Sequence, residues 1–239
     1  MVSCSTDSLQ PIENEYHFTK YSFMKLADAG FSLIIPTQNP QYLLQNKEYM
    51  DILKKTKSVI EVTIPSIKAG PEACGIFKTN APPSLQRLKA MEKIVQEGLP
   101  VRLRLEPLIP DIKQDGRVPL QTEEDIDTLV YEFARIIEKA HKSIRKDMII
   151  ITNTMTWSEN IRFKDEYREF YLKNGIEYVK DENFKIWFLN PDIEIQLLSI
   201  VYQKCIKYNI PFSPCVHRSK FLNSCTCEFP NLFNRICGG

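Results

Sequence analysis

The sequence predicts an α/β fold whose parallel strands are arranged as in a barrel, or in part of one. Two observations predict it. Short segments rich in β-branched residues alternate along the chain with longer segments whose apolar residues recur at helical spacing, which is typical of right-handed βαβ units. The clearest strand segment also carries charged side chains along one of its two faces. Because a parallel sheet covered by helices on both sides has strands that are apolar throughout, the polar face favours a barrel wall.

Nine elements follow from this pattern. In chain order, we expect helices over residues 17–30, 41–56, 85–98 and 122–140 and after Asp192, and strands over residues 31–37, 58–65, 100–109 and 147–155. Each strand segment is short, and those over 31–37, 58–65 and 147–155 are rich in Ile, Val and Thr, whereas the segment over 100–109 alternates apolar with charged residues. Irregular segments that contain Pro follow the second and third strands, and we interpret them as loops.

The last three helices are supported by their apolar stripes and their ends. The helix over 85–98 ends at Gly98, and the helix that begins at Thr122 has Asp125 three residues later, as in a capping box. In the final helix, Cys205 falls on the apolar stripe and is expected in the core. The residues expected to face inward are Leu85, Leu88, Met91, Ile94 and Val95 in the first, Ile126, Leu129, Val130, Phe133, Ile136, Ile137 and Ala140 in the second, and Leu197, Leu198, Val201, Tyr202 and Cys205 in the third.

The two faces of the strand over 100–109 differ in polarity. Val101, Leu103 and Leu105 face one way, and Arg102, Arg104 and Glu106 face the other. In the preceding strand, Glu61 and Thr63 are the polar members of the same alternation. Charges that point inward are costly unless they are paired or bound to something. Two interpretations stay open: a barrel interior that binds a polar ligand, or a structural Arg–Glu network that fills it.

Composition limits the classes of partner. The chain has 239 residues, of which 43% are hydrophobic, and its 31 Lys and Arg against 30 Asp and Glu give a net charge of +1. This balance gives no general electrostatic case for nucleic acid or an anionic membrane, although a local patch leaves a nucleic-acid partner undecided. No apolar run approaches the roughly twenty residues of a membrane span. The first twenty residues have no apolar signal-peptide core, which predicts a cytoplasmic protein without a membrane partner.

The cysteines are concentrated at the end of the chain, and we divide the sequence into a barrel domain over 1–209 and a Cys-rich segment over 210–239. Cys215, Cys225, Cys227 and Cys237 offer four thiols, enough for a zinc ion or an auxiliary iron–sulfur cluster. Their separation by nine, one and nine residues is not a usual zinc-knuckle spacing, so free thiols are the alternative.

Three segments carry a resemblance to a known family. Residues 5–13 (STDSLQPIE), 80–88 (NAPPSLQRL) and 97–110 (EGLPVRLRLEPLIP) resemble, in order and spacing, segments of the radical S-adenosylmethionine superfamily in its spore photoproduct lyase-like branch. The resemblance covers roughly residues 2–155. It implies a partial (β/α)6 barrel of the TIM type that lacks its first strand. It also implies lyase-like radical chemistry, in which S-adenosylmethionine bound against a 4Fe-4S cluster yields a deoxyadenosyl radical.

The resemblance also implies the residues that meet the cofactor. Ser5, Thr6 and Asp7 are expected at the amino end of S-adenosylmethionine, and Thr37 and Gln38 at its carboxylate or ribose. Thr63, Arg104 and Glu106 complete the expected cofactor-binding set, and Arg104 and Glu106 are expected to line the lumen.

The cluster motif of that family, CxxxCxxC, does not occur in the sequence. Three thiolates that leave one iron open are what allow such a cluster to bind the cofactor. We therefore expect a truncated or split protein whose cluster segment comes from a separate chain. The alternative is a non-catalytic, metal-stabilised binding subunit that pairs with another chain. The sequence does not specify a substrate.

Overall fold

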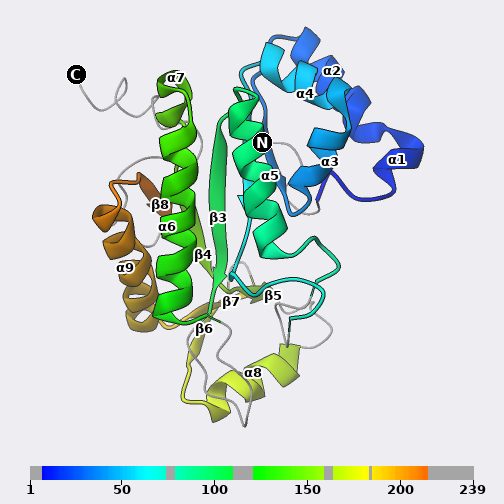
Figure 1. The fold of residues 1–239 in the computed structure, drawn as a ribbon. Coiled ribbons are helices and arrows are strands. Elements are labelled where there is room, and N and C mark those ends of the chain that lie inside the picture. The colour runs from blue at the N-terminus through cyan, green and yellow to red at the C-terminus, as the bar shows by residue number, and fades with distance from the viewer. Residues whose placement is uncertain (1–6, 74–78, 110–120, 159–163, 183–184, 215–239) are drawn as a thin grey trace, which may run out of the picture.

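A five-stranded parallel sheet organises the computed structural model, which describes residues 7–73, 79–109, 121–158, 164–182 and 185–214 (Figure 1). Its strands are β1 (Ile34–Thr37), β2 (Val59–Thr63), β3 (Val101–Leu108), β4 (Ile150–Thr154) and β8 (Phe212–Pro214), and they lie side by side in that order. Every neighbouring pair is parallel. The four predicted strands are therefore confirmed, and β8 is a fifth that the pattern did not predict.

Helices pack against this sheet and against one another. They are α1 (Glu13–Tyr16), α2 (Phe18–Asp28), α3 (Pro40–Gln45), α4 (Lys47–Lys55), α5 (Ser84–Gln96), α6 (Glu123–Lys139), α7 (Lys142–Arg145) and α9 (Pro191–Lys207). Helix α3 packs on α5, α5 on α6, and α6 on α9, so successive helices lie next to one another as they do on the outside of a barrel (Figure 1). The α/β prediction and the arrangement of a partial barrel are confirmed. The helix expected over 41–56 is two helices that meet at Asn46.

The apolar strand faces and the apolar helix stripes meet in one core. Ile60, Val62, Leu103 and Leu105 are fully buried there, and most of the predicted stripes of α6 and α9, including Cys205, are buried with them. The stripe residues Ile137, Leu197 and Tyr202 are partly buried and pack against this core. One expected core residue is misplaced: Leu85 is 58% exposed, because it lies in the first turn of α5 on the solvent side.

Local signals at the helix ends are confirmed in part. The Thr122 side chain accepts a hydrogen bond from the backbone N–H of Asp125 at 3.1 Å. The Asp125 side chain does not complete the box; instead its Oδ1 accepts a hydrogen bond from the N–H of Ile67 at 3.0 Å. The start of α6 is thereby connected to the loop after β2. Gly98, at a φ of 89°, follows the end of α5 as expected.

A small antiparallel sheet with one helix is inserted between β4 and α9. It consists of β5 (Trp157–Ser158), α8 (Lys164–Lys173), β6 (Tyr178–Asp181) and β7 (Ile186–Leu189), with the strand order β5-β7-β6. This unit lies at the carboxyl ends of the parallel strands (Figure 1). A second apolar cluster connects it to the loops after β2 and β3, through Tyr171 and Leu189 on one side and Ala69 and Ile109 on the other. No helix in the described part of the chain has the length and apolar composition needed to cross a membrane.

Candidate functional site

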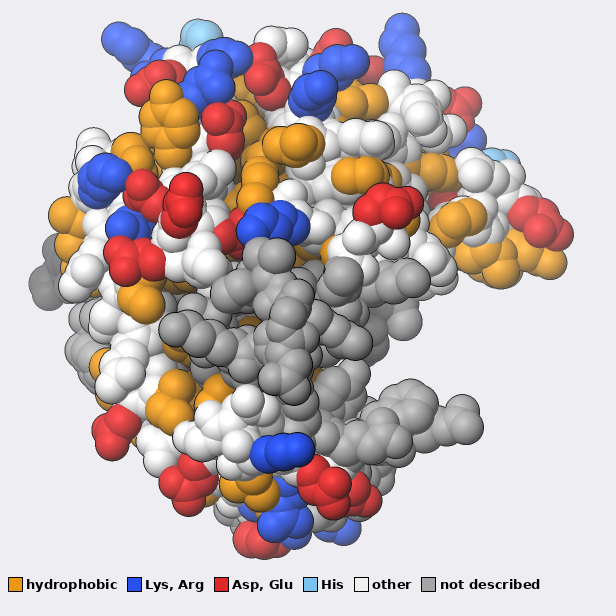
Figure 2. All heavy atoms as spheres, turned by 60° about the horizontal axis from the view of Figure 1, so that its bottom comes forward, with side chains coloured by type: hydrophobic (Ala, Val, Ile, Leu, Met, Phe, Trp, Pro, Cys, Tyr) orange, Lys and Arg blue, Asp and Glu red, His pale blue; other side chains and the backbone are white. Residues whose placement is uncertain are grey.

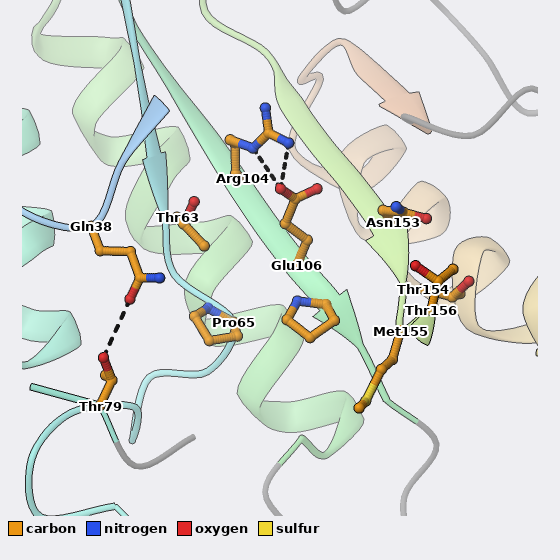
Figure 3. A pocket seen from close by; sticks show the side chains of 11 residues that line it. Gln38, Thr63, Pro65, Thr79, Arg104, Glu106, Asn153, Thr154, Met155 and Thr156 are labelled. Carbon is orange, nitrogen blue, oxygen red and sulfur yellow. Dashed lines mark hydrogen bonds and ion pairs between the residues drawn. The ribbon is translucent and has the colours of Figure 1, made fainter. Parts of the chain in front are cut away.

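A cavity of about 620 Å³ opens where β2, β3 and β4 end (Figure 3). The carboxyl ends of parallel strands are where barrel enzymes place their ligands. Most of the polar groups that line it are uncharged amides and hydroxyls. Its lining consists of Gln38, Thr63, Pro65, Thr79, Arg104, Glu106, Pro107, Asn153, Thr154, Met155 and Thr156.

The wall of the cavity continues into a buried ion network. The carboxylate of Glu61 on β2 accepts two hydrogen bonds. Nη1 of Arg102 donates to its Oε1 at 3.0 Å, and Nη1 of Arg104 donates to its Oε2 at 2.6 Å. Arg104 also donates from Nε to Oε1 of Glu106 at 2.6 Å, and its Nη2 contacts the same oxygen. Glu61 and Arg102 are fully buried, whereas the side chains of Arg104 and Glu106 are 13% and 17% exposed, toward the cavity. The Arg–Glu network considered from the sequence is therefore present, and two of its members also line the cavity.

The network sets the protonation of its members. Burial by itself lowers the pKa of Arg104, but the adjacent carboxylates of Glu106 and Glu61 outweigh this, and the pKa is raised above its usual value. Burial raises the pKa of Glu106 above 4.5, because the opposing effect of Arg104 is smaller. Arg104 is therefore a permanent cation, while Glu106 takes up a proton more readily than an exposed carboxylate.

Two oxygens that line the cavity lack partners. Oε2 of Glu106 and Oδ1 of Asn153 are buried and make no hydrogen bond in the described structure. Buried acceptors are nearly always satisfied in proteins, so both atoms indicate a place for a ligand or a water molecule.

Asp7 and Thr37, both expected to meet the cofactor, are bonded to each other. The carboxylate of Asp7 accepts hydrogen bonds from Oγ1 of Thr37 at 2.9 Å and from the backbone N–H of Gln38 at 2.6 Å. Its Oδ1 also accepts the N–H of Leu9 at 2.9 Å. Of the three residues Asp7, Thr37 and Gln38, only Gln38 lines the cavity, where Thr79 donates to its Oε1 at 3.5 Å. Asp7 thus fixes the turn that presents Gln38.

Two buried residues that sequence reasoning did not single out support the cavity. Arg87 is fully buried on α5 and donates from Nη1 to the carbonyl of Thr63 at 2.8 Å. Gln121 donates to the carbonyl of Pro65 at 2.7 Å and accepts the N–H of Ile109 at 2.7 Å. Arg87 lies in one of the three family-like segments, and its position on the apolar face of a helix was the sequence feature that could have indicated a buried, paired role. No feature of the sequence indicated the role of Gln121.

The remaining predicted site residues lie outside the described residues. These are Ser5 and Thr6 near the start of the chain and Cys215, Cys225, Cys227 and Cys237 near its end. Within the described ranges, no group of three or more His, Cys, Asp or Glu residues is placed to hold a metal ion.

The surface at the end of the molecule where the parallel strands have their carboxyl ends carries charges of both signs. Figure 2 shows Lys and Arg side chains interspersed with Asp and Glu side chains over the part of this face that the structure describes. That part therefore offers no continuous basic surface.

Comparisons with known proteins identify the fold. No family model matches the chain, and curated protein sequences give no significant match. A solved structure of spore photoproduct lyase complexed with dinucleoside spore photoproduct has a TM-score of 0.60 at 14% identity. A mutant of the same enzyme with bound AdoMet and dinucleoside spore photoproduct has a TM-score of 0.59 at 13% identity. Each match covers 89% of this chain.

The chain has the fold of spore photoproduct lyase. The resemblance seen in the three sequence segments is confirmed at the level of the fold. The chain spans 58% of the length of these spore photoproduct lyase structures. At this identity, the likeness to spore photoproduct lyase establishes the fold and no more.

Proposed function

We propose that the cavity at the carboxyl ends of β2 to β4 binds S-adenosylmethionine and that the chain is the cofactor-binding part of a radical enzyme. The observation that carries the proposal is the position of this polar cavity in the fold of spore photoproduct lyase, for which a structure with bound AdoMet is known. Gln38 and Thr63 supply amide and hydroxyl groups for a polar ligand, and Arg104 lies between them and β4 (Figure 3). S-adenosylmethionine would supply a deoxyadenosyl group as the source of a radical. The contribution of this chain is to bind and orient the cofactor.

The described residues do not fit an iron–sulfur cluster. The only cysteine among them is Cys205, which is buried in the core on α9, and the whole sequence lacks CxxxCxxC. We therefore propose that the thiolates for such a cluster come from a separate chain. In the alternative proposal, the missing motif means that the chain is a binding subunit without chemistry of its own, with a metal held by the tail cysteines.

Titration of the full chain with S-adenosylmethionine by isothermal calorimetry tests the proposal. We expect saturable binding of one molecule per chain, weakened in Gln38→Ala and Thr63→Ala and unchanged in Gln96→Ala, whose side chain is exposed on α5. No binding to the wild-type chain would reject the proposal. After anaerobic reconstitution with iron and sulfide, the chain alone should produce no 5′-deoxyadenosine. Multiple turnovers would show that it holds a complete cluster site.

A further inference from the structure

The two unpartnered oxygens in the cavity come from neighbouring strands. Glu106 lies on β3 and Asn153 on β4, and both side chains lie on the cavity side of the sheet (Figure 3). Arg104 engages Glu106 only through Oε1, which leaves Oε2 free to accept. Two buried acceptors without donors in one cavity indicate a ligand group that donates hydrogen bonds.

The charges around Glu106 favour a cationic donor. When Glu106 is ionised, its charge and that of Glu61 balance those of Arg102 and Arg104, so the network is neutral. Burial raises the pKa of Glu106, so a cation placed beside this carboxylate stabilises its ionised form. An ammonium at Oε2 adds a second cationic partner on the side of the carboxylate that Arg104 leaves without a hydrogen bond. A phosphate group offers only acceptors and negative charge, and it would be repelled by the same oxygen.

We propose that Glu106 and Asn153 form a subsite for a primary ammonium group of the substrate, with Glu106 as its counter-ion. An ammonium has three N–H donors, of which Oε2 and Oδ1 accept two. The hydroxyl of Thr154, which lines the same cavity, is a further acceptor. This inference rests on the proposed function in that it leaves S-adenosylmethionine to the Gln38 and Thr63 side and assigns Glu106 to the substrate.

Two small probes of the same shape test it. Benzylamine is a cation at neutral pH, whereas benzyl alcohol is neutral. We expect the wild-type chain to bind benzylamine at least about tenfold more tightly than benzyl alcohol, since a hydrogen bond to a charged group is worth that much. Glu106→Gln should remove the preference, and Glu138→Gln, an exposed change on α6, should preserve it.

A second variant separates recognition from folding. Glu106→Gln also alters the partner of Arg104, but Asn153→Ala leaves the ion network intact and should still weaken benzylamine about tenfold. Equal binding of the two probes to the wild-type chain, or unchanged binding of benzylamine in both variants, overturns the inference. Loss of benzylamine binding in the presence of saturating S-adenosylmethionine also overturns it, because the subsite then belongs to the cofactor. If benzylamine behaves as expected while S-adenosylmethionine does not bind, the proposed function fails and the ammonium subsite stands.

Discussion

Glu61 and Arg104 are joined diagonally across two neighbouring strands, with Oε2 of Glu61 2.6 Å from Nη1 of Arg104. The register of β2 and β3 places Arg102, not Arg104, directly opposite Glu61. Glu61 therefore forms one ion pair with Arg102, directly opposite, and a second with Arg104, which lies two residues further along β3. Because this carboxylate is fully buried, its negative charge must be compensated by the two arginines. Arg104, which lines the cavity, is thereby held in place by a residue inside the sheet.

Arg104→Ala should destabilise the chain far more than Arg135→Ala. The first change leaves the buried Glu61 with one partner and Glu106 with none, and breaking such a pair typically costs about 3–5 kcal/mol. Arg135 is paired with Glu132 on the surface of α6, where a substitution costs about 0.5 kcal/mol or less. Urea denaturation measures both. Equal midpoints for the two variants would contradict the assignment of Arg104 to a buried network.

Asp7→Ala should destabilise the turn that presents Gln38. The change removes the acceptor for the backbone N–H of Gln38 and for Oγ1 of Thr37, and we expect a loss of about 1–3 kcal/mol from groups left without a partner. Asp51→Ala on the exposed side of α4 is the control. The amide of Gln38 should also exchange its hydrogen faster in Asp7→Ala. Slow exchange there would show that another group holds the turn.

Much of the fold could be predicted because most of its helices, and the strand β3, have one apolar and one polar side. The stripes of α6 and α9 and the alternation in β3 are set by burial, which has a fixed period in each kind of element. Strand β8 has only three residues, which is too short for a periodic pattern. Helix α8 and its small sheet pack against loops that are distant in the sequence, at Ala69 and Ile109, and these contacts leave no local pattern. The apolar spacing over residues 41–56 predicted one helix, but the structure has two helices that are separated at Asn46.

The same distinction applies to the site. The inward direction of Arg104 and Glu106 followed from strand alternation, and both line the cavity. The role of Asp7 did not follow, since its partners lie about thirty residues away and only the folded chain brings them together. Long-range hydrogen bonds from single polar residues leave no periodic trace in a sequence.

Glu13→Gln should reduce stability at neutral pH by about 1–3 kcal/mol, because the carboxylate accepts hydrogen bonds from Tyr49 and from the backbone N–H groups of Thr19 and Lys20 at the start of α2. Burial by itself raises the pKa of Glu13, but these hydrogen bonds outweigh it and the pKa lies below 4.5. A carboxylate whose pKa is lower in the folded state stabilises the fold above its usual pKa and loses that effect as the pH falls through the folded value.

The difference between wild type and Glu13→Gln should therefore shrink as the pH is lowered below about 4.5. Chemical denaturation at a series of pH values measures it, with the exposed Glu15→Gln as the control. A difference that stays constant down to pH 3 would mean that Glu13 acts through its shape and not through its charge.

Gln121→Ala should loosen the mouth of the cavity. The side chain of Gln121 is buried, donates to the carbonyls of Pro65 and Pro107 at 2.7 and 3.3 Å, and accepts the N–H of Ile109 at 2.7 Å, so it connects the ends of β2 and β3. Removing it leaves a buried N–H without an acceptor, and we expect a loss of about 1–3 kcal/mol, against almost none for the exposed Gln96→Ala.

Gln121→Glu separates the two halves of this connection. A carboxylate still accepts the N–H of Ile109 but has no N–H to donate to the carbonyl of Pro65. Hydrogen exchange at the Ile109 amide should therefore be fast in Gln121→Ala and remain slow in Gln121→Glu, although both variants are less stable than the wild type. If the amide is equally protected in Gln121→Ala, then Ile109 is held by its burial against α8 and its small sheet, and Gln121 is not the group that connects the two strand ends.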